Sequence, residues 1–186
     1  MNLYDLLPTF KVVEINNVVG LRSGHIIAQA LTNKADFAAG AAAYAENGYI
    51  LYLDIDGELK APRACDAQVI AAQAPILHYT EELFTGISQE LKHFAVEWDA
   101  DNVAYLRGLV LSLGDTFTTD NYSGTLSGAT LAGIDTNGAF VLYADKAAAV
   151  TATYQGPLFN VVESTLPDGI TDAAELTLIS NYVDVA

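Results

Sequence analysis

Apolar and polar residues alternate over short stretches of this chain, and the alternation predicts β-strands separated by tight turns. The first is a β-branched run at 10–19, bounded by Pro8 and Gly20. Similar runs lie at 25–31, 49–55, 75–80, 93–98, 103–111, 115–119, 129–134, 139–143, 157–163 and 175–181. This pattern favours a mainly β fold, built from small antiparallel β-barrel or sandwich units with one or two short helices, rather than βαβ units.

Two turn sequences, DIDGEL at 54–59 and DTNGAF at 135–140, are strong hairpin signals. They begin 135 − 54 = 81 residues apart, and a strand that starts with proline follows each of them, at Pro75 and at Pro157. A duplicated β unit would explain this similarity, and so would the reuse of common turn chemistry.

Three segments depart from the strand pattern. The Ala-rich residues 33–46 predict a short helix that ends at Asn47-Gly48. Residues 66–73 fit a strand or a helix equally well. Residues 81–91 carry apolar side chains at near-helical spacing, which predicts one or two helical turns.

The size and composition indicate a folded protein. With 186 residues, the chain is long enough for one core, so we expect a single domain over 1–186, or two β sub-units at 1–75 and 76–186. The apolar content of 52% is enough to offset the ordering entropy of folding. No apolar run approaches the roughly 20 residues that span a bilayer, and the N-terminus lacks the pattern of a signal peptide. We therefore expect synthesis in the cytoplasm and no membrane partner.

The charge of the chain argues against nucleic acid as a partner. Its formal net charge is −15, and Lys146 is the only cation after Gly108. A field of this sign repels phosphate backbones and anionic lipid headgroups, which bind through lysine and arginine.

Motifs for metal binding are weak. His25, His78 and His93 lie on separate predicted strands without the spacing of a zinc motif. Asp54 and Asp56 resemble the start of a calcium loop, but the twelfth position of that loop is Cys65 instead of glutamate. A lone cysteine forms no intrachain disulfide and is expected to be a buried, inert thiol. We predict no metal and no cofactor.

Motifs for catalysis are equally weak. The chain has no Gly-x-Ser-x-Gly elbow, and residues 123–128 lie between predicted strands as a flexible corner. A glycine-rich phosphate loop with its lysine is also missing. An Asp/Glu pair in a cleft remains an alternative, but no motif selects its members, so we expect a protein that is not an enzyme.

One apolar cluster is a candidate contact arm. It lies near the N-terminus, where a chain frays unless it docks. Its members are Leu3, Tyr4, Leu6, Leu7 and Phe10. The same cluster could instead close the protein's own core.

The sequence LGDTFTTDNY at 113–122 carries a family resemblance. Together with the turn at 135–138 and the run NVVE at 160–163, it resembles a pattern of tailed-bacteriophage capsid decoration (cement) proteins. In that pattern GDxFTT, a DGK-type hairpin and a late Val-Val-Glu strand recur, and residues 47–60 match more loosely. The chain departs from the pattern at residues 33–46 and at Ala139, where lysine is usual.

This resemblance implies a non-catalytic virion structural protein. Such a protein binds the outer surface of the phage head through the major capsid protein, stabilises contacts between capsomers and can also contact copies of itself as a homo-oligomer. It would be made in the host cytoplasm and reside on the capsid exterior. The alternative is a head-fibre or tail-associated adhesin module that contacts the host surface.

Overall fold

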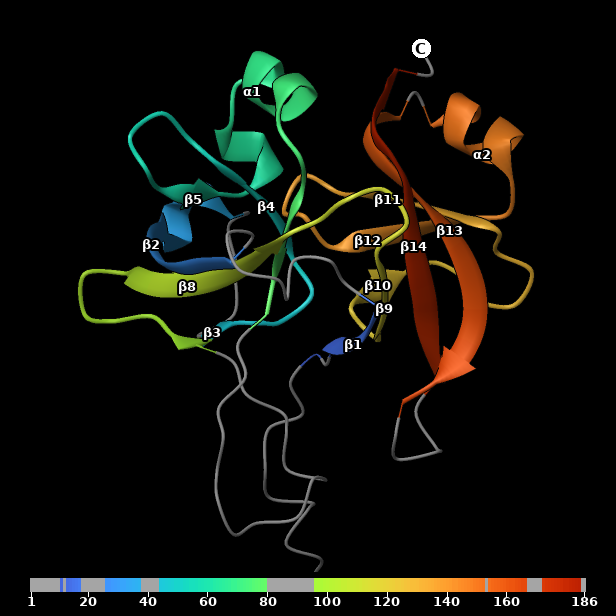
Figure 1. Cartoon of the computed structure of the whole chain (residues 1–186), viewed down its shortest axis with the longest axis horizontal. Helices are drawn as coiled ribbons and strands as arrows, with labels where there is room; N and C mark the ends of the chain where they lie inside the picture. Colours follow the sequence, from blue (N-terminus) through green and yellow to red (C-terminus); the bar gives the residue numbers. More distant parts are fainter. Residues whose placement is uncertain are drawn as a thin grey trace, which may run out of the picture.

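The fold is mainly β, as the sequence predicts, with two larger sheets side by side and two short α-helices in the described part of the chain (Figure 1). The computed structural model describes residues 11, 13–17, 26–37, 44–79, 96–152, 154–166 and 172–184. The predicted helical turns at 81–91 lie outside these residues.

The seven-stranded sheet holds most of the C-terminal half of the chain. Its order is β1-β9-β14-β13-β11-β12-β10, and its neighbours are antiparallel except for the parallel pair β10 and β12. The strands are β1 (Val13–Asn17), β9 (Thr116–Thr119), β10 (Tyr122–Ser123), β11 (Leu131–Ile134), β12 (Phe140–Tyr143), β13 (Gln155–Thr165) and β14 (Asp172–Asp184).

The five-stranded sheet has the order β2-β8-β6-β4-β5 and is antiparallel. Its strands are β2 (Ile26–Asn33), β4 (Ile50–Leu53), β5 (Leu59–Lys60), β6 (Ile76–His78) and β8 (Val103–Val110), and a separate pair is formed by β3 (Tyr44–Ala45) and β7 (Val96–Glu97). Because the edge strands β2 and β5 also contact each other, this sheet curls towards a closed barrel. Both large sheets draw strands from either side of residue 75, and the division into domains stays a prediction.

The helices differ from those that the sequence predicts. Within 33–46, Lys34–Asp36 form a 3₁₀ turn and Tyr44–Ala45 form β3, so the expected helix is wrong at both described ends. The ambiguous segment forms α1 (Ala67–Ala72), after a 3₁₀ turn at Pro62–Ala64. Among the described residues, no helix is long and apolar enough to cross a membrane.

A second helix, α2 (Lys146–Thr151), was not predicted. Its N-cap is Asp145, whose Oδ1 accepts a hydrogen bond from the Ala148 amide at 2.9 Å. An aspartate that precedes an Ala-rich run is a recognisable start signal, so the sequence did contain the information.

The two large sheets share one hydrophobic core. At its centre the rings of Phe117, Phe140 and Phe159 pack against one another, with centroids 5.1–6.0 Å apart. Strand β4 lies between this core and a second one inside the five-stranded sheet, because alternate side chains point to opposite faces. Ile50 contributes to the shared core and Leu51 to the second core, and both are fully buried.

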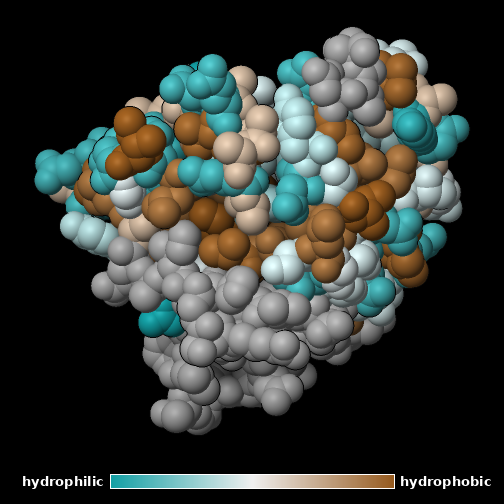
Figure 2. All heavy atoms as spheres, turned by 45° about the horizontal axis from the view of Figure 1, so that its top comes forward, coloured by the Kyte–Doolittle hydropathy of each residue, from teal (hydrophilic) through white to brown (hydrophobic). Residues whose placement is uncertain are grey.

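The shared core reaches the surface on the side that carries both helices. Figure 2 looks onto that side and shows a band of hydrophobic side chains across the middle, between polar ones. Half-buried residues that pack on the shared core include Val69 and Ile70 of α1 and Val183 of β14. We interpret the band as the edge of the shared core.

The turn at 135–138, here called the Gly138 turn, fastens the two sheets together. The Ile50 amide of β4 donates to the Gly138 carbonyl at 2.8 Å, and the Arg63 amide donates to the Thr136 carbonyl at 3.0 Å. Gly138 has φ +93°, and a Cβ built on it would collide with the backbone carbonyl of Ile50. This position therefore requires glycine for both its conformation and its close approach.

Tyr154 completes the seven-stranded sheet where β13 turns away from β11. Its buried hydroxyl accepts a hydrogen bond from the Ile134 amide at 3.0 Å and donates one to the Pro157 carbonyl at 2.5 Å. The ring lies against Gly133, where any Cβ would overlap it. The hydroxyl thus satisfies the Ile134 amide and the Pro157 carbonyl, two buried backbone groups at the place where β11 and β13 separate.

Replacing the glycine of each hairpin turn separates conformational strain from contact between the sheets. Gly57 has φ +84°, and nothing lies within 4 Å of the place that a Cβ would take, so Gly57→Ala should cost about 1–2 kcal/mol of unfolding free energy, from strain alone. Gly138→Ala should cost at least about 3 kcal/mol, because the added methyl also forces the turn away from β4. Urea unfolding of both variants measures the difference, and equal losses would contradict the role of the Gly138 turn.

Candidate functional site

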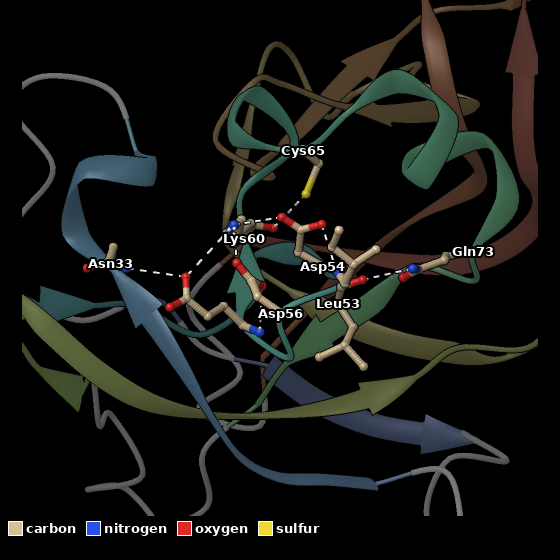
Figure 3. A network of polar contacts seen from close by, with 9 residues as sticks. Asn33, Leu53, Asp54, Asp56, Lys60, Cys65 and Gln73 are labelled. Carbon is tan, nitrogen blue, oxygen red and sulfur yellow. Dashed lines mark hydrogen bonds and ion pairs between the residues drawn. The ribbon is translucent and has the colours of Figure 1, made fainter.

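The hairpin between β4 and β5 is held by one lysine among carboxylates (Figure 3). The Lys60 ammonium lies 2.6 Å from Asp54 Oδ2, 3.0 Å from Asp56 Oδ2 and 3.9 Å from Glu58 Oε2. Hydrogen bonds from this ammonium lower the pKa of both aspartates, and the aspartates in turn raise the pKa of Lys60. The ammonium thus occupies the place that the sequence pattern offered to calcium.

The same hairpin borders the seam between β2 and β5. Asn33 Nδ2 of β2 donates to Glu58 Oε2 at 3.4 Å, which links the two edge strands through side chains. Asp36 lies near this group, and burial raises the pKa of its carboxyl while the nearby Lys60 lowers it. Among the described residues, no group of three or more His, Cys, Asp and Glu side chains is arranged to hold a metal ion.

His78 is the one predicted histidine within the described residues, since His25 and His93 lie outside them. It is fully buried in β6, and its Nδ1 lies 2.8 Å from the Arg107 carbonyl. A carbonyl can only accept, so Nδ1 carries the proton. Burial lowers the pKa of His78, although the nearby backbone carbonyls oppose that shift. The lowered pKa favours the neutral imidazole in the folded protein near pH 7.

Cys65 is half-buried after the 3₁₀ turn and contacts the Lys60 carbonyl, with Sγ 3.8 Å from that oxygen. Burial raises the pKa of its thiol to about 11. Because the thiolate is the reactive form, this cysteine is a poor nucleophile near neutral pH.

The outward face of the seven-stranded sheet carries an uncharged row of side chains. Strand pairing places these residues directly beside one another across five strands, over roughly 19 Å at about 4.8 Å per strand. The row consists of Tyr143, Leu131, Asn160, Thr177 and Thr116. Its Tyr143 end is covered, because that ring packs on the buried Tyr154, with centroids 5.9 Å apart, and on the shared core. The buried neighbours Ala132, Phe159 and Leu178 point to the opposite face, into the shared core.

Exposed apolar residues flank this row. Val162 of β13 is 51% exposed and shares the outward face of Asn160 by alternation. Ile179 of β14 is 46% exposed and follows the buried Leu178 at an irregularity of the β13–β14 pairing. The hydroxyls of Thr116 and Thr177 lie 3.1 Å apart and hydrogen bond to each other. We call Leu131, Asn160, Val162, Thr177 and Ile179 the contact face.

The contact face contrasts with the charge of the chain. Nine acidic residues follow Gly108, and none of them lies in the row from Tyr143 to Thr116. In the neighbouring row, strand pairing places two acidic residues among those described, Glu175 opposite Val162 and Glu14 on the far side of Thr118. Depletion of charge is a feature that the centres of protein–protein interfaces share.

The predicted contact arm lies outside the described residues, so Leu3, Tyr4, Leu6, Leu7 and Phe10 remain a prediction. Sequence reasoning did not identify the contact face. The signal was present in 158–163, where Phe159 and Val161 alternate inward and Val162 is an apolar residue on the outward side.

Comparison with protein-family models, with curated proteins and with solved structures gives no match.

The buried His78 makes stability depend on pH. Its folded pKa lies below the unfolded value of about 6.5, so the unfolded chain binds the proton first as the pH falls. We expect the unfolding free energy to fall between pH 7.5 and 5.5, by up to about 1.4 kcal/mol per pH unit. Urea unfolding across this range should show a smaller slope for His78→Gln than for the wild type. If the slope of unfolding free energy against pH is the same in both proteins, groups other than His78 cause the pH dependence.

Proposed function

We propose that this chain is a non-catalytic virion structural protein that binds the outer surface of a phage head and stabilises contacts between capsomers. The sequence resemblance at 113–122 motivates the proposal, and the contact face carries it. An uncharged, half-exposed strip on a strongly acidic protein is suited to bury itself against another protein.

The scaffold supports this role physically. The contact face lies on β11, β13 and β14, of which the last two pair along most of their length, and the far side of the same sheet packs into the shared core. Such a face is pre-organised, so little conformational entropy is lost when it binds. Many copies of a modest contact, repeated by the symmetry of a shell, add up to a strong hold.

The acidic charge of the rest of the surface would help to keep decorated phage heads apart in solution. Like charges on neighbouring particles repel, which keeps decorated heads dispersed. The same charge disfavours binding of the protein to packaged nucleic acid.

Binding to shells tests the proposal. Purified protein should bind phage heads assembled without it and should make those heads more resistant to heat, because each bound copy adds contacts between capsomers. Cosedimentation of protein with heads measures the first effect, and release of packaged DNA on heating measures the second. No binding, together with equal stability of heads that lack the chain, would contradict the proposal.

A matched pair of substitutions locates the contact. Val162→Glu places a charge on the contact face and should weaken binding about tenfold or more, since burying it would require desolvating the carboxylate. Val150 on α2 is 44% exposed and lies off that face, so Val150→Glu should bind within about twofold of the wild type. Affinity for host cells or glycans instead of heads would favour the adhesin alternative.

A further inference from the structure

Ile55, at the tip of the β4–β5 hairpin, is 96% exposed and so makes almost no contact with the rest of the protein. A side chain that is exposed in both the folded and the unfolded chain contributes little to folding. The fold therefore does not explain an isoleucine at this position.

The tip that presents Ile55 is rigid. Two backbone hydrogen bonds close the turn. The Gly57 amide donates to the Asp54 carbonyl at 3.0 Å, and the Asp54 amide donates to the Glu58 carbonyl at 2.9 Å. The Asp54 carboxylate also accepts from the Ile55 amide at 2.7 Å, and Lys60 bonds the same carboxylate. The backbone on both sides of Ile55 is thus fixed by hydrogen bonds, while its side chain projects into solvent.

The Gly138 turn shows that the turn itself does not need isoleucine. The Gly138 turn has the same two backbone hydrogen bonds. The Gly138 amide donates to the Asp135 carbonyl at 3.0 Å, and the Asp135 amide donates to the Ala139 carbonyl at 2.8 Å. Its glycine has a similar positive φ, +93° against +84° for Gly57. The residue in the position of Ile55 is Thr136, so a polar side chain satisfies the same geometry.

We propose that Ile55 is an anchor residue that inserts into an apolar pocket of a shell subunit whose rim carries lysine or arginine. This inference rests on the proposed function and adds a second attachment point to it. A protein that joins neighbouring capsomers must hold at two places. The β4–β5 hairpin and the β13–β14 pair lie towards opposite ends of the long axis of the molecule (Figure 1).

Charge sets the chemistry of the pocket rim. Three carboxylates of the tip, Asp54, Asp56 and Glu58, share the single ammonium of Lys60. The tip therefore carries net negative charge around an apolar centre. A rim of basic side chains complements it, whereas a second copy of this acidic chain would repel it.

The test replaces Ile55 with the residue that the Gly138 turn uses. Ile55→Thr should leave the thermal unfolding midpoint unchanged and should weaken binding to phage heads assembled without the chain by about tenfold or more, as expected for an anchor residue. Val150→Thr, an exposed position on α2, is the matched control and should bind within about twofold of the wild type. Wild-type binding should also weaken as salt rises, because the rim contacts are ionic.

The outcomes separate the two proposals. If the wild type binds heads and Ile55→Thr binds equally well, the anchor is refuted while the proposed function stands. If the wild type does not bind, the proposed function fails and the anchor fails with it. A photo-cross-linking residue at position 55 that attaches to the shell protein would support the anchor, and exclusive attachment to another copy of this chain would overturn it.

Discussion

The contact between the Gly138 turn and β4 is the constraint on which the rest of the structure depends. The five-stranded sheet has a second core of its own, whereas the phenylalanine core is shared and includes Ile50 and Tyr52 of β4. The turn holds the two sheets together with backbone groups: the Ile50 amide finds its acceptor on Gly138, and the Arg63 amide finds its acceptor on Thr136. A side chain at residue 138 would keep the two backbones apart.

Local patterns predicted the strands well, because alternation and turn chemistry act over a few residues. Both hairpin turns form where Asp-Gly and Asn-Gly predicted them. The sequence could not show that one turn is buried against β4 while the other projects into solvent, since that depends on contacts between distant segments. For the same reason Tyr44–Ala45 pair with β7 as a strand although the Ala-rich run around them favours a helix.

The candidate surfaces were harder to predict than the strands. The apolar N-terminal arm stands out in the sequence because its residues cluster, whereas the contact face is assembled from β11, β13 and β14 and exists only once these strands pair. Ile55 is conspicuous only when its exposure is known, because an isoleucine between two aspartates fits a strand end equally well. Asp54 and Asp56 form an ion-paired turn because Lys60, four residues beyond Asp56, reaches back to both carboxylates.

The proposed function requires a rigid body with a contact surface on each sheet. Its rigidity comes from the shared core, and its surfaces are an uncharged strip on one sheet and an exposed isoleucine on the other. A body whose two sheets moved independently could not hold two neighbouring subunits at a fixed spacing.

Native-state hydrogen exchange tests this rigidity most directly. The Ile50 and Arg63 amides, which donate to the Gly138 turn, should exchange only through global unfolding, with the same free energy as the amides of Leu106 and Leu176 inside the two sheets. Exchange of the Ile50 and Arg63 amides at a much lower free energy would show that the sheets separate without unfolding, and would contradict the account.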